Sequence, residues 1–496
     1  MRILNYDTLT SHGNIEGRKK TIEILEAALQ AADPYQNTKK LARIDDDKLF
    51  VGYPDFVLNG SPRTGTEVFN LNKDIDRIFV FGAGKGIQRI AEALEAVLGD
   101  YLTGGHILLK YGDKHNLKKV SVSHGGHPVP DENCVKGCYK LVQKIKESKL
   151  SSRDLVFTII GNGASSLLTM PPDGINLDDV ALITSILQIE KGIPTMTLNL
   201  VRNQVDQLKG GRITRLIHPA KMVHIIPIDL NEKNALGKEG YEGWIYNNFW
   251  LHTLPDISTP EKAIEVLKEN EVCDRISPAI LEYLYNEATN NDVLKPEEFE
   301  KMDCRIFGIM PTKMNFIAAA IEKSKELGYT PHFMMRKTFA EASIAGSLLS
   351  RIAVNVADEG EPFKAPCALI FTGELLVTAG NEAGVGGRNQ EFALSAAQVI
   401  QGNKRIVVAA CDTDGTDGPG GYINEEAAKM GCTNLAGGIV DGYTCLEAEK
   451  KGLDISHALK IHNSSDILWK INSGIWTTQN ISIQDIIIML IMDHDG

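Results

Sequence analysis

Two glycine-rich stretches decide the fold: Gly384-Val385-Gly386-Gly387-Arg388-Asn389-Gln390-Glu391 and Asp412-Thr413-Asp414-Gly415-Thr416-Asp417-Gly418-Pro419. The first joins a predicted strand at 375–378 to a predicted helix at about 389–400, and the second follows a predicted strand at 406–411. Both therefore fall at the carboxyl ends of strands, where open α/β sheets bind their ligands. This placement predicts an α/β fold whose ligand-binding loops share one edge of a sheet.

The two stretches carry opposite charges. Arg388 stands at the start of the predicted helix, beside backbone N–H groups that are free to meet an anion. Three carboxylates within six residues, Asp412, Asp414 and Asp417, suit a hard cation or can take up a proton. A cationic helix start and an acidic glycine-rich loop together indicate phosphate and magnesium. The alternative is two ordinary surface turns with solvated charges.

A third glycine-rich turn follows the predicted strand at 78–81 and contains Gly82, Gly84 and Lys85. The helix predicted after it, at 87–98, has a good 3.6-residue apolar period. The spacing is neither that of a Walker loop nor that of the dinucleotide fingerprint. Lys85 at a helix start is a natural phosphate ligand, and the alternative is a tight turn with a solvated lysine.

Two further loops carry candidate substrate ligands. The apolar run at 154–160 predicts a strand buried on both faces, and Gly161-Asn162-Gly163-Ala164-Ser165-Ser166 follows it. The N–H groups of this loop and the Ser165 hydroxyl suit a carboxylate or a phosphate. His127 lies in a proline-rich loop and is a candidate substrate contact, although a lone loop histidine is more often structural or exposed.

Strands alternate with helices along most of the chain, which predicts largely parallel sheets with helices on both faces. Residues 33–73 look irregular, and a helix is expected at 201–216. The composition of the chain changes in residues 231–300, and we expect the domain boundary to lie in this stretch. We therefore expect an N-terminal domain at residues 15–265 and a C-terminal domain at 266–496.

Composition narrows the class of protein. A chain of 496 residues is long enough for two or more domains, and its net charge of -12 argues against nucleic acid as the main partner. The longest apolar run, at 486–492, is too short to span a bilayer and predicts a buried strand. The eight cysteines are scattered without a zinc pattern. We expect a cytoplasmic protein that binds no membrane and no nucleic acid.

Six motifs in order resemble those of the glycerate 2-kinases that end in a MOFRL domain. They are Gly82-Ala83-Gly84-Lys85, His127-Pro128-Val129-Pro130-Asp131, Lys209-Gly210-Gly211-Arg212, Thr372-Gly373-Glu374, Gly386-Gly387-Arg388-Asn389-Gln390-Glu391 and Thr413-Asp414-Gly415-Thr416-Asp417-Gly418-Pro419. The resemblance implies a Rossmann-like N-terminal domain, a MOFRL region at about 365–490, and an active site in the cleft between two domains. It also implies ATP with Mg²⁺ and phosphorylation of glycerate on its 2-hydroxyl. A homodimer is compatible with it.

The leading hypothesis is an ATP-dependent kinase of glycerate or a related small hydroxy or sugar acid. Its catalytic residues would be Lys85, Arg388 and Asp414. The substrate would be bound by Gly163, Ser165, His127, Glu374 and Asn389. The nucleotide would be bound by Gly82, Gly84, Lys209, Gly386, Gly387, Gly415 and Thr416. The metal ligands would be Asp412, Asp414 and Asp417.

The chain departs from the family pattern in loops expected to hold the substrate. The family's usual Ser-Gly-Gly-Gly-Ser, Val-Arg-Lys-His and Ser-Gly-Pro-Thr are here Gly161-Asn162-Gly163-Ala164-Ser165, Val201-Arg202-Asn203-Gln204 and Trp250-Leu251-His252-Thr253. We therefore expect an acid other than glycerate to be the better substrate. The alternatives are a divergent homologue that binds a sugar acid or nucleotide without kinase turnover, and a hydroxypyruvate-type oxidoreductase. The oxidoreductase would need a nicotinamide site, and no complete fingerprint for one is present.

Overall fold

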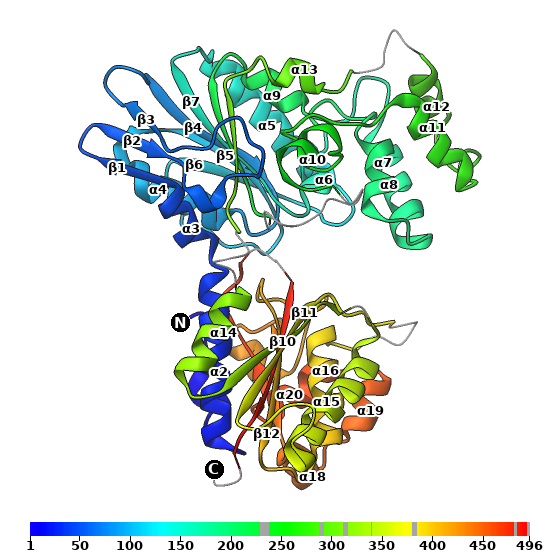
Figure 1. Cartoon of the computed structure of the whole chain (residues 1–496). Helices are drawn as coiled ribbons and strands as arrows, with labels where there is room; N and C mark the ends of the chain where they lie inside the picture. The colour runs from blue at the N-terminus through cyan, green and yellow to red at the C-terminus, as the bar shows by residue number, and fades with distance from the viewer. Residues whose placement is uncertain are drawn as a thin grey trace. The chain divides into compact units, whose positions relative to one another are not determined.

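The computed structural model describes residues 1–228, 238–286, 292–310, 316–338, 340–378, 384–480 and 484–493, except for the side chains of 189 and 337. The chain forms two compact units (Figure 1). One is Pro34–Pro311, and the other combines Met1–Asp33 with Thr312–Gly496. The division differs from the expected boundary near residue 265, because residues 260–310 complete the first unit and the N-terminal helix packs in the second.

The Pro34–Pro311 unit is built on a six-stranded sheet in the order β6-β5-β4-β7-β8-β9, and every pair in it is parallel. Its strands are β4 (Arg77–Ala83), β5 (Leu102–Lys110), β6 (Val120–Gly125), β7 (Asp154–Ile160), β8 (Lys221–Ile226) and β9 (Cys304–Gly308). The order reverses at β4, which lies between β5 and β7. This is the order of Rossmann-like sheets, whose ligands bind at the reversal.

The same unit contains elements that the sequence pattern did not predict. The stretch expected to be irregular forms α3 (Pro34–Leu41) and a three-stranded antiparallel sheet of β1 (Ala42–Asp45), β2 (Lys48–Val51) and β3 (Glu67–Asn70). Each of these strands has only four residues and one buried face, so no long apolar run reveals it.

The helix expected at 201–216 is interrupted. It is α8 (Thr195–Arg202) followed, after a gap, by α9 (Arg212–Ile217). Gly210 and Gly211, directly before α9, have φ of 61° and 78°, a left-handed conformation that a continuous α-helix cannot contain. The remaining helices of the unit are α4 (Gln88–Leu98), α5 (Glu132–Ser148), α6 (Ala164–Leu167), α7 (Leu177–Thr184) with a π-helical extension (Ser185–Glu190), α10 (Gly240–Tyr246), α11 (Pro260–Glu269), α12 (Pro278–Tyr285), α13 (Pro296–Phe299), and the 3₁₀ turns η1 (Pro54–Phe56) and η2 (Gly99–Tyr101). Residues 229–237 lie outside the described residues.

The second unit has a mixed sheet in the order β10-β11-β15-β12-β13-β14. Its strands are β10 (Thr330–Thr338), β11 (Cys367–Gly373), β12 (Ile406–Asp412), β13 (Gly437–Asp441), β14 (Gly474–Ile475) and β15 (Asp485–Ile491). Only β10 and β11 pair in parallel, whereas β15 runs antiparallel to both of its neighbours. The expectation of a largely parallel sheet is therefore corrected here. The strand expected at 375–378 is also wrong, because β11 ends at Gly373.

The antiparallel direction of β15 has a consequence for the ligand edge of this sheet. Asp485, the first residue of β15, pairs with Gly373 at the end of β11 and with Asp412 at the end of β12. The start of one buried apolar strand thus lies among the carboxyl ends of its two neighbours.

Helices cover both faces of the mixed sheet (Figure 1). The N-terminal α2 (Ile15–Ala31) packs beside α14 (Phe316–Glu326) on one face, and α15 (Ala342–Glu359) packs beside α16 (Arg388–Ile400) on the other. The other helices are α1 (Tyr6–Leu9), α17 (Glu425–Lys429), α18 (Thr444–Lys450), α19 (Ile455–Lys460) and α20 (Ser464–Lys470). Thus α2 belongs to the C-terminal unit, although residues 15–265 were expected to form one domain.

A buried ion pair fixes α2 in this unit. Arg18 Nε lies 2.5 Å from Asp441 Oδ2 at the end of β13, and both side chains are fully buried. Arg18 also donates hydrogen bonds to the Leu9 carbonyl and the Ser473 hydroxyl. The guanidinium therefore ties the first twenty residues to a strand more than 400 positions later.

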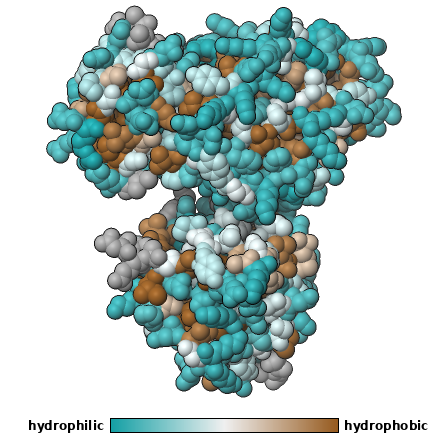
Figure 2. Space-filling view, turned by 180° about the vertical axis from the view of Figure 1, so that it is seen from behind, coloured by the Kyte–Doolittle hydropathy of each residue, from teal (hydrophilic) through white to brown (hydrophobic). Residues whose placement is uncertain are grey.

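The surface seen in Figure 2 is mainly hydrophilic, with hydrophobic residues in separate patches. Among the described residues, no helix is both long enough and apolar enough to cross a membrane.

We predict that Asp441→Asn destabilises the second unit by about 3–5 kcal/mol, because Arg18 would remain buried without a counter-charge. The matched control is Glu16→Ala, which breaks the Lys20–Glu16 ion pair of the same helix at its exposed partner and should cost about 0–1 kcal/mol. Differential scanning calorimetry should show one transition moving in Asp441→Asn and neither moving appreciably in Glu16→Ala. Equal losses of stability in the two variants would contradict the role of the Arg18–Asp441 ion pair in holding α2.

Candidate functional site

The strand-order reversal of the first unit brings three predicted loops together. Lys85 follows β4, and its backbone N–H donates to the Asn162 carbonyl, 2.7 Å away, in the loop after β7. A Cβ atom on Gly163 would lie 2.9 Å from the His127 ring and 2.9 Å from Lys85 Cγ. The side chains of Lys85 and His127 therefore both lie against Gly163.

Lys85 brings a positive charge to this place, and the buried Asp113 is close enough to feel it. The Lys85 side chain is half-buried, and its ammonium has no hydrogen-bond or ion-pair partner in the part of the chain that the structure describes. His127 keeps an exposed face, yet desolvation by its neighbours and the charge of Lys85 lower its pKa to about 4. His127 is therefore neutral at pH 7, and Lys85 supplies the positive charge.

Ser165 belongs to a buried network that the sequence did not reveal. Its hydroxyl accepts a hydrogen bond from Asn199 Nδ2 at 3.0 Å and lies 2.9 Å from His252 Nε2. Burial, followed by the charges of Lys209 and Arg202, keeps the pKa of His252 well below its usual value, so this imidazole is neutral. The only sequence signal for His252 was its place in a loop that departs from the family pattern.

Two predicted nucleotide contacts in this unit have structural roles instead. Lys209 is fully buried, and its ammonium lies 2.5 Å from Asp206 Oδ2 and 3.1 Å from the Thr169 hydroxyl. Its charge is thus neutralised inside the protein. Gly82 lies within β4, where a Cβ atom would stand 2.2 Å from the Ile159 carbonyl oxygen. Gly82 therefore permits close strand packing, and Gly84 is the first loop residue.

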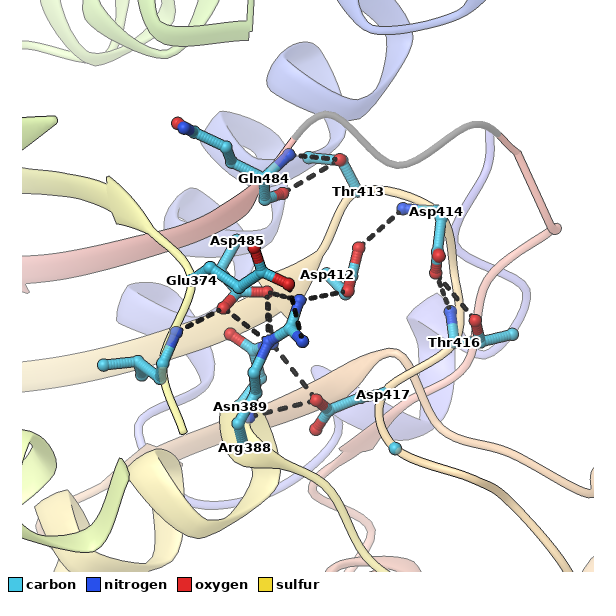
Figure 3. Close-up of polar contacts among 12 residues, drawn as sticks. Glu374, Arg388, Asn389, Asp412, Thr413, Asp414, Thr416, Asp417, Gln484 and Asp485 are labelled. Atoms are coloured by element: carbon cyan, nitrogen blue, oxygen red, sulfur yellow. Dashed lines mark hydrogen bonds and ion pairs between the residues drawn. The ribbon is translucent and has the colours of Figure 1, made fainter. Parts of the chain in front are cut away.

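The second unit gathers its predicted residues around Arg388, the first residue of α16 (Figure 3). Arg388 Nε lies 2.7 Å from Asp485 Oδ2, and Nη2 lies 2.8 Å from Asp412 Oδ2. Glu374 is more remote, at 3.5 Å from Nη1, and is 63% exposed. Asp485 was missed because a parallel sheet would have placed it at the opposite edge.

This cluster holds more negative than positive charge. Burial raises the pKa of Asp412 well above its usual range, and Asp414 and Asp485 raise it further against the opposing effect of Arg388. Burial also raises the pKa of Asp485. For Arg388, burial alone would lower the pKa, but Asp485 and Asp412 outweigh it and the pKa is raised. Arg388 is therefore an anchored cation, with its Nη1 side turned toward the exposed Glu374.

Asp417 caps the helix that was expected to be free for phosphate. Its carboxylate accepts from the backbone N–H groups of Asn389 and Gln390, at 3.2 and 2.9 Å, and from Asn389 Nδ2. Burial and the charge of Asp485 raise its pKa to about 7 in spite of these hydrogen bonds. An internal carboxylate thus occupies the anion position at this helix N-terminus.

The expected magnesium cluster is not formed. Asp412 faces Arg388, Asp417 caps α16, and Asp414 Oδ1 accepts from the Thr416 N–H and hydroxyl at 2.7 and 2.8 Å. Within the described ranges, no group of three His, Cys, Asp or Glu side chains could hold a metal ion. The assignment of Asp412, Asp414 and Asp417 as a joint metal site is corrected, and Gly415 and Thr416 form the turn between them.

A pocket of about 310 Å³ lies beside this cluster. Predicted residues Gly386, Gly387 and Arg388 line it, together with Leu375, Leu376, Val377, Gly384, Glu391, Gly418, Pro419 and His462. The volume is at the lower end of the range for small-molecule sites, about 300–1,000 Å³. Asn389, expected to bind substrate, is instead fully buried and donates to Asp485 Oδ1 at 2.8 Å.

Comparison with known proteins decides the ancestry. One family model, described as a domain of unknown function (DUF4147), matches residues 20–234, and the MOFRL family model matches residues 367–482. D-glycerate 2-kinase of Thermotoga maritima is 31% identical over 84% of this chain and 92% of that protein. The chain belongs to the glycerate 2-kinase family with a MOFRL domain. The predicted family is therefore confirmed.

Two further comparisons complete the placement in the glycerate 2-kinase family. The crystal structure of glycerate kinase from Thermotoga maritima matches with a TM-score of 0.72 and 27% identity, covering 96% of this chain and 99% of that chain. A relative in Agrobacterium vitis named putative hydroxypyruvate reductase is 28% identical over 78% of this chain and 92% of that protein. The first supports the two-unit α/β fold, and the second shows that the family carries more than one name.

We predict that Arg388→Met destabilises the protein on the order of 3–5 kcal/mol at pH 8, because Asp412 and Asp485 would lose the cation that compensates them. The pKa values of Asp412 and Asp485 are higher in the folded protein than in the unfolded chain. Ionisation of each carboxyl therefore lowers the free energy of unfolding as the pH rises from its unfolded pKa toward its folded pKa. The loss should therefore shrink at pH 5.

Denaturant unfolding at the two pH values measures the effect. The compensating change Asp485→Asn in the Arg388→Met background should restore part of the stability. A loss of the same size at both pH values, without rescue, would contradict the role of these carboxylates.

Proposed function

We propose that the protein is an ATP-dependent kinase that phosphorylates a hydroxyl of glycerate or a related small hydroxy acid. Family membership supports the reaction class. The observation that carries the proposal is Lys85, a half-buried ammonium without a described partner at the strand-order reversal of a Rossmann-like sheet. Such a group is suited to the negative charge of a transferring phosphoryl group.

Phosphoryl transfer asks a protein mainly for positioning and for stabilisation of charge on the transferring group. Lys85 supplies the charge, and backbone N–H groups of the neighbouring glycine-rich loops supply further donors. In the other unit, Arg388 offers Nη1 to a ligand, since Asp485 and Asp412 hold its other two nitrogens. The two carboxylates thus give the Arg388 guanidinium a fixed orientation before any ligand binds.

The acceptor hydroxyl needs a group that takes its proton. Glu374 and Asp414 are the candidates, because neither is buried and both belong to the acidic cluster around Arg388. The neutral His127 is suited to hold a hydroxyl of the acid by hydrogen bonding.

We propose that Mg²⁺ arrives with the nucleotide rather than at a protein-only site. Magnesium is usually held by one or two carboxylates together with phosphate oxygens. The described carboxylates fit that supporting role, with Asp414 as the first candidate, but they do not form a cluster that could hold the ion alone.

We predict that Lys85→Met lowers the rate of phosphoryl transfer on the order of 10²-fold or more and leaves the melting temperature nearly unchanged, because Lys85 Nζ forms no described hydrogen bond or ion pair that the substitution would break. The matched control is Lys114→Met, which removes an exposed lysine from a nearby loop and should keep full activity. ADP formation in a coupled assay measures the rates of both variants.

The same assay should be run with glycerate, tartronate, erythronate and threonate to find the acid. An acid with more polar groups than glycerate is expected to react best, because the altered loops place His252 and Asn199 around Ser165. Oxidation of NADH by hydroxypyruvate without ADP formation from any acid would contradict the kinase and favour the oxidoreductase.

A further inference from the structure

Arg202, the last residue of α8, is a buried cation without a described counter-charge. Its side chain is 4% exposed, and Nη2 donates to Gln188 Oε1 at 2.8 Å. Its buried Nε has no hydrogen-bond partner, and no carboxylate pairs with it among the residues that the structure places. Burial lowers its pKa to about 10, so the guanidinium still carries its charge at neutral pH.

A buried charge without a counter-charge lowers the stability of the folded protein. Removing an ion from water is unfavourable even after the protein relaxes, unless a partner of opposite charge compensates it. The other buried cations in this unit do have anionic neighbours: Lys209 pairs with Asp206, and the charges of Asp206 and Asp256 act on Arg212. An anionic ligand at Arg202 would therefore supply the negative charge that the described residues do not provide.

The neighbours of Arg202 lead to the loop after β7. Asn199 precedes it by three residues on α8, so the two side chains share one helix face. Asn199 Nδ2 donates to the Ser165 hydroxyl, and Ser165 lies two residues after Gly163, which contacts Lys85 and His127. The charge of Arg202 is close enough to lower the pKa values of both His127 and His252. Arg202 therefore lies near the site of Lys85 and His127, at the end of α8.

We propose that Arg202 binds the carboxylate of the hydroxy-acid substrate, and that Asn199 and His252 position Ser165 as the polar floor of that subsite. This inference rests on the proposed kinase function and assigns the acceptor acid within it. Guanidinium groups suit carboxylates because their planar N–H donors match the two oxygens. The substrate class is then a small acid whose carboxylate lies near the hydroxyl that takes the phosphoryl group.

The test is binding of glycerate and tartronate, without nucleotide, to the full chain and to Arg202→Met. Isothermal calorimetry should show a loss of affinity of about tenfold to a hundredfold in the variant, as expected when a hydrogen bond to a charged group is removed. ADP affinity should stay the same. The matched control is Arg275→Met, which removes an exposed guanidinium paired with Glu190 and should bind the acids normally.

The melting temperature separates a binding role from a structural one. If Arg202 serves the ligand, Arg202→Met without acid should melt at the same temperature as the native protein or higher, because an uncompensated charge is removed. Addition of acid should then stabilise the native protein and Arg275→Met but not Arg202→Met. Arg202→Lys, which retains the charge, should recover part of the acid response.

Three results would overturn the proposal. They are unchanged acid affinity in Arg202→Met, absence of acid binding to the native protein, and stabilisation by inorganic phosphate that depends on Arg202 while the acids have no effect. Failure of the kinase function is seen separately. It would appear as no ADP formation from any acid while Arg202-dependent acid binding persists, a result that supports the subsite.

Discussion

The contact of Arg388 with Asp485 and Asp412 determines how the second unit is built. It joins the first residue of α16 to the first residue of β15 and to the end of β12. Two buried carboxylates at adjacent strand ends would repel each other without this cation. With it, the start of β15 is compensated where it lies between the ends of β11 and β12, and the start of α16 is held beside Asp417, which caps it. The acidic loop and the helix therefore form one internally compensated structure.

The Pro34–Pro311 unit is organised in the opposite way. Its Rossmann-like strand order brings the loops after β4 and β7 together, and the cations near them, Lys85 and Arg202, have no described carboxylate partner. Lys209, which looks equivalent in sequence, is satisfied by Asp206. A cation that stabilises the fold has a carboxylate partner within the protein, whereas a cation that binds a ligand has none until the ligand arrives. By this criterion, the negative charge of a ligand is expected at Lys85 and Arg202.

Much of the first unit could be predicted because its determining features are local. Strands β4, β6 and β7 each end at a glycine-rich loop, and parallel strands bring such ends to one edge, so the pattern itself indicates that Lys85, Gly163 and His127 share an edge of the sheet. The same reasoning misplaced Lys209, since a basic residue beside glycines does not reveal the Asp206 that neutralises it. Gly82 was misassigned for a related reason, as a glycine that ends a strand looks like one that begins a loop.

The second unit was harder to predict because its contacts join distant residues. Asp485 lies 97 positions from Arg388, and the direction of β15 leaves no trace in its uniformly apolar sequence. The partner of Arg18, Asp441, is 423 positions away, so the sequence could not show that α2 belongs to the C-terminal unit. Two altered residues of the 201–204 loop likewise find their partners more than fifty positions along the chain. Gln204 donates to Ser258, and Asn203 donates to Asp256, which keeps these departures from the family pattern buried and hydrogen-bonded.

The central claim is that the unpaired cations of the Pro34–Pro311 unit receive the ligand's negative charge. A crystal structure of the full chain with glycerate and a non-hydrolysable ATP analogue tests it most directly. The account predicts a phosphate oxygen within hydrogen-bond distance of Lys85 Nζ and carboxylate oxygens at Arg202, while Arg388 remains on Asp412 and Asp485. A structure in which every anionic group of the ligands contacts the other unit, with Lys85 in solvent and Arg202 still unpartnered, would contradict it.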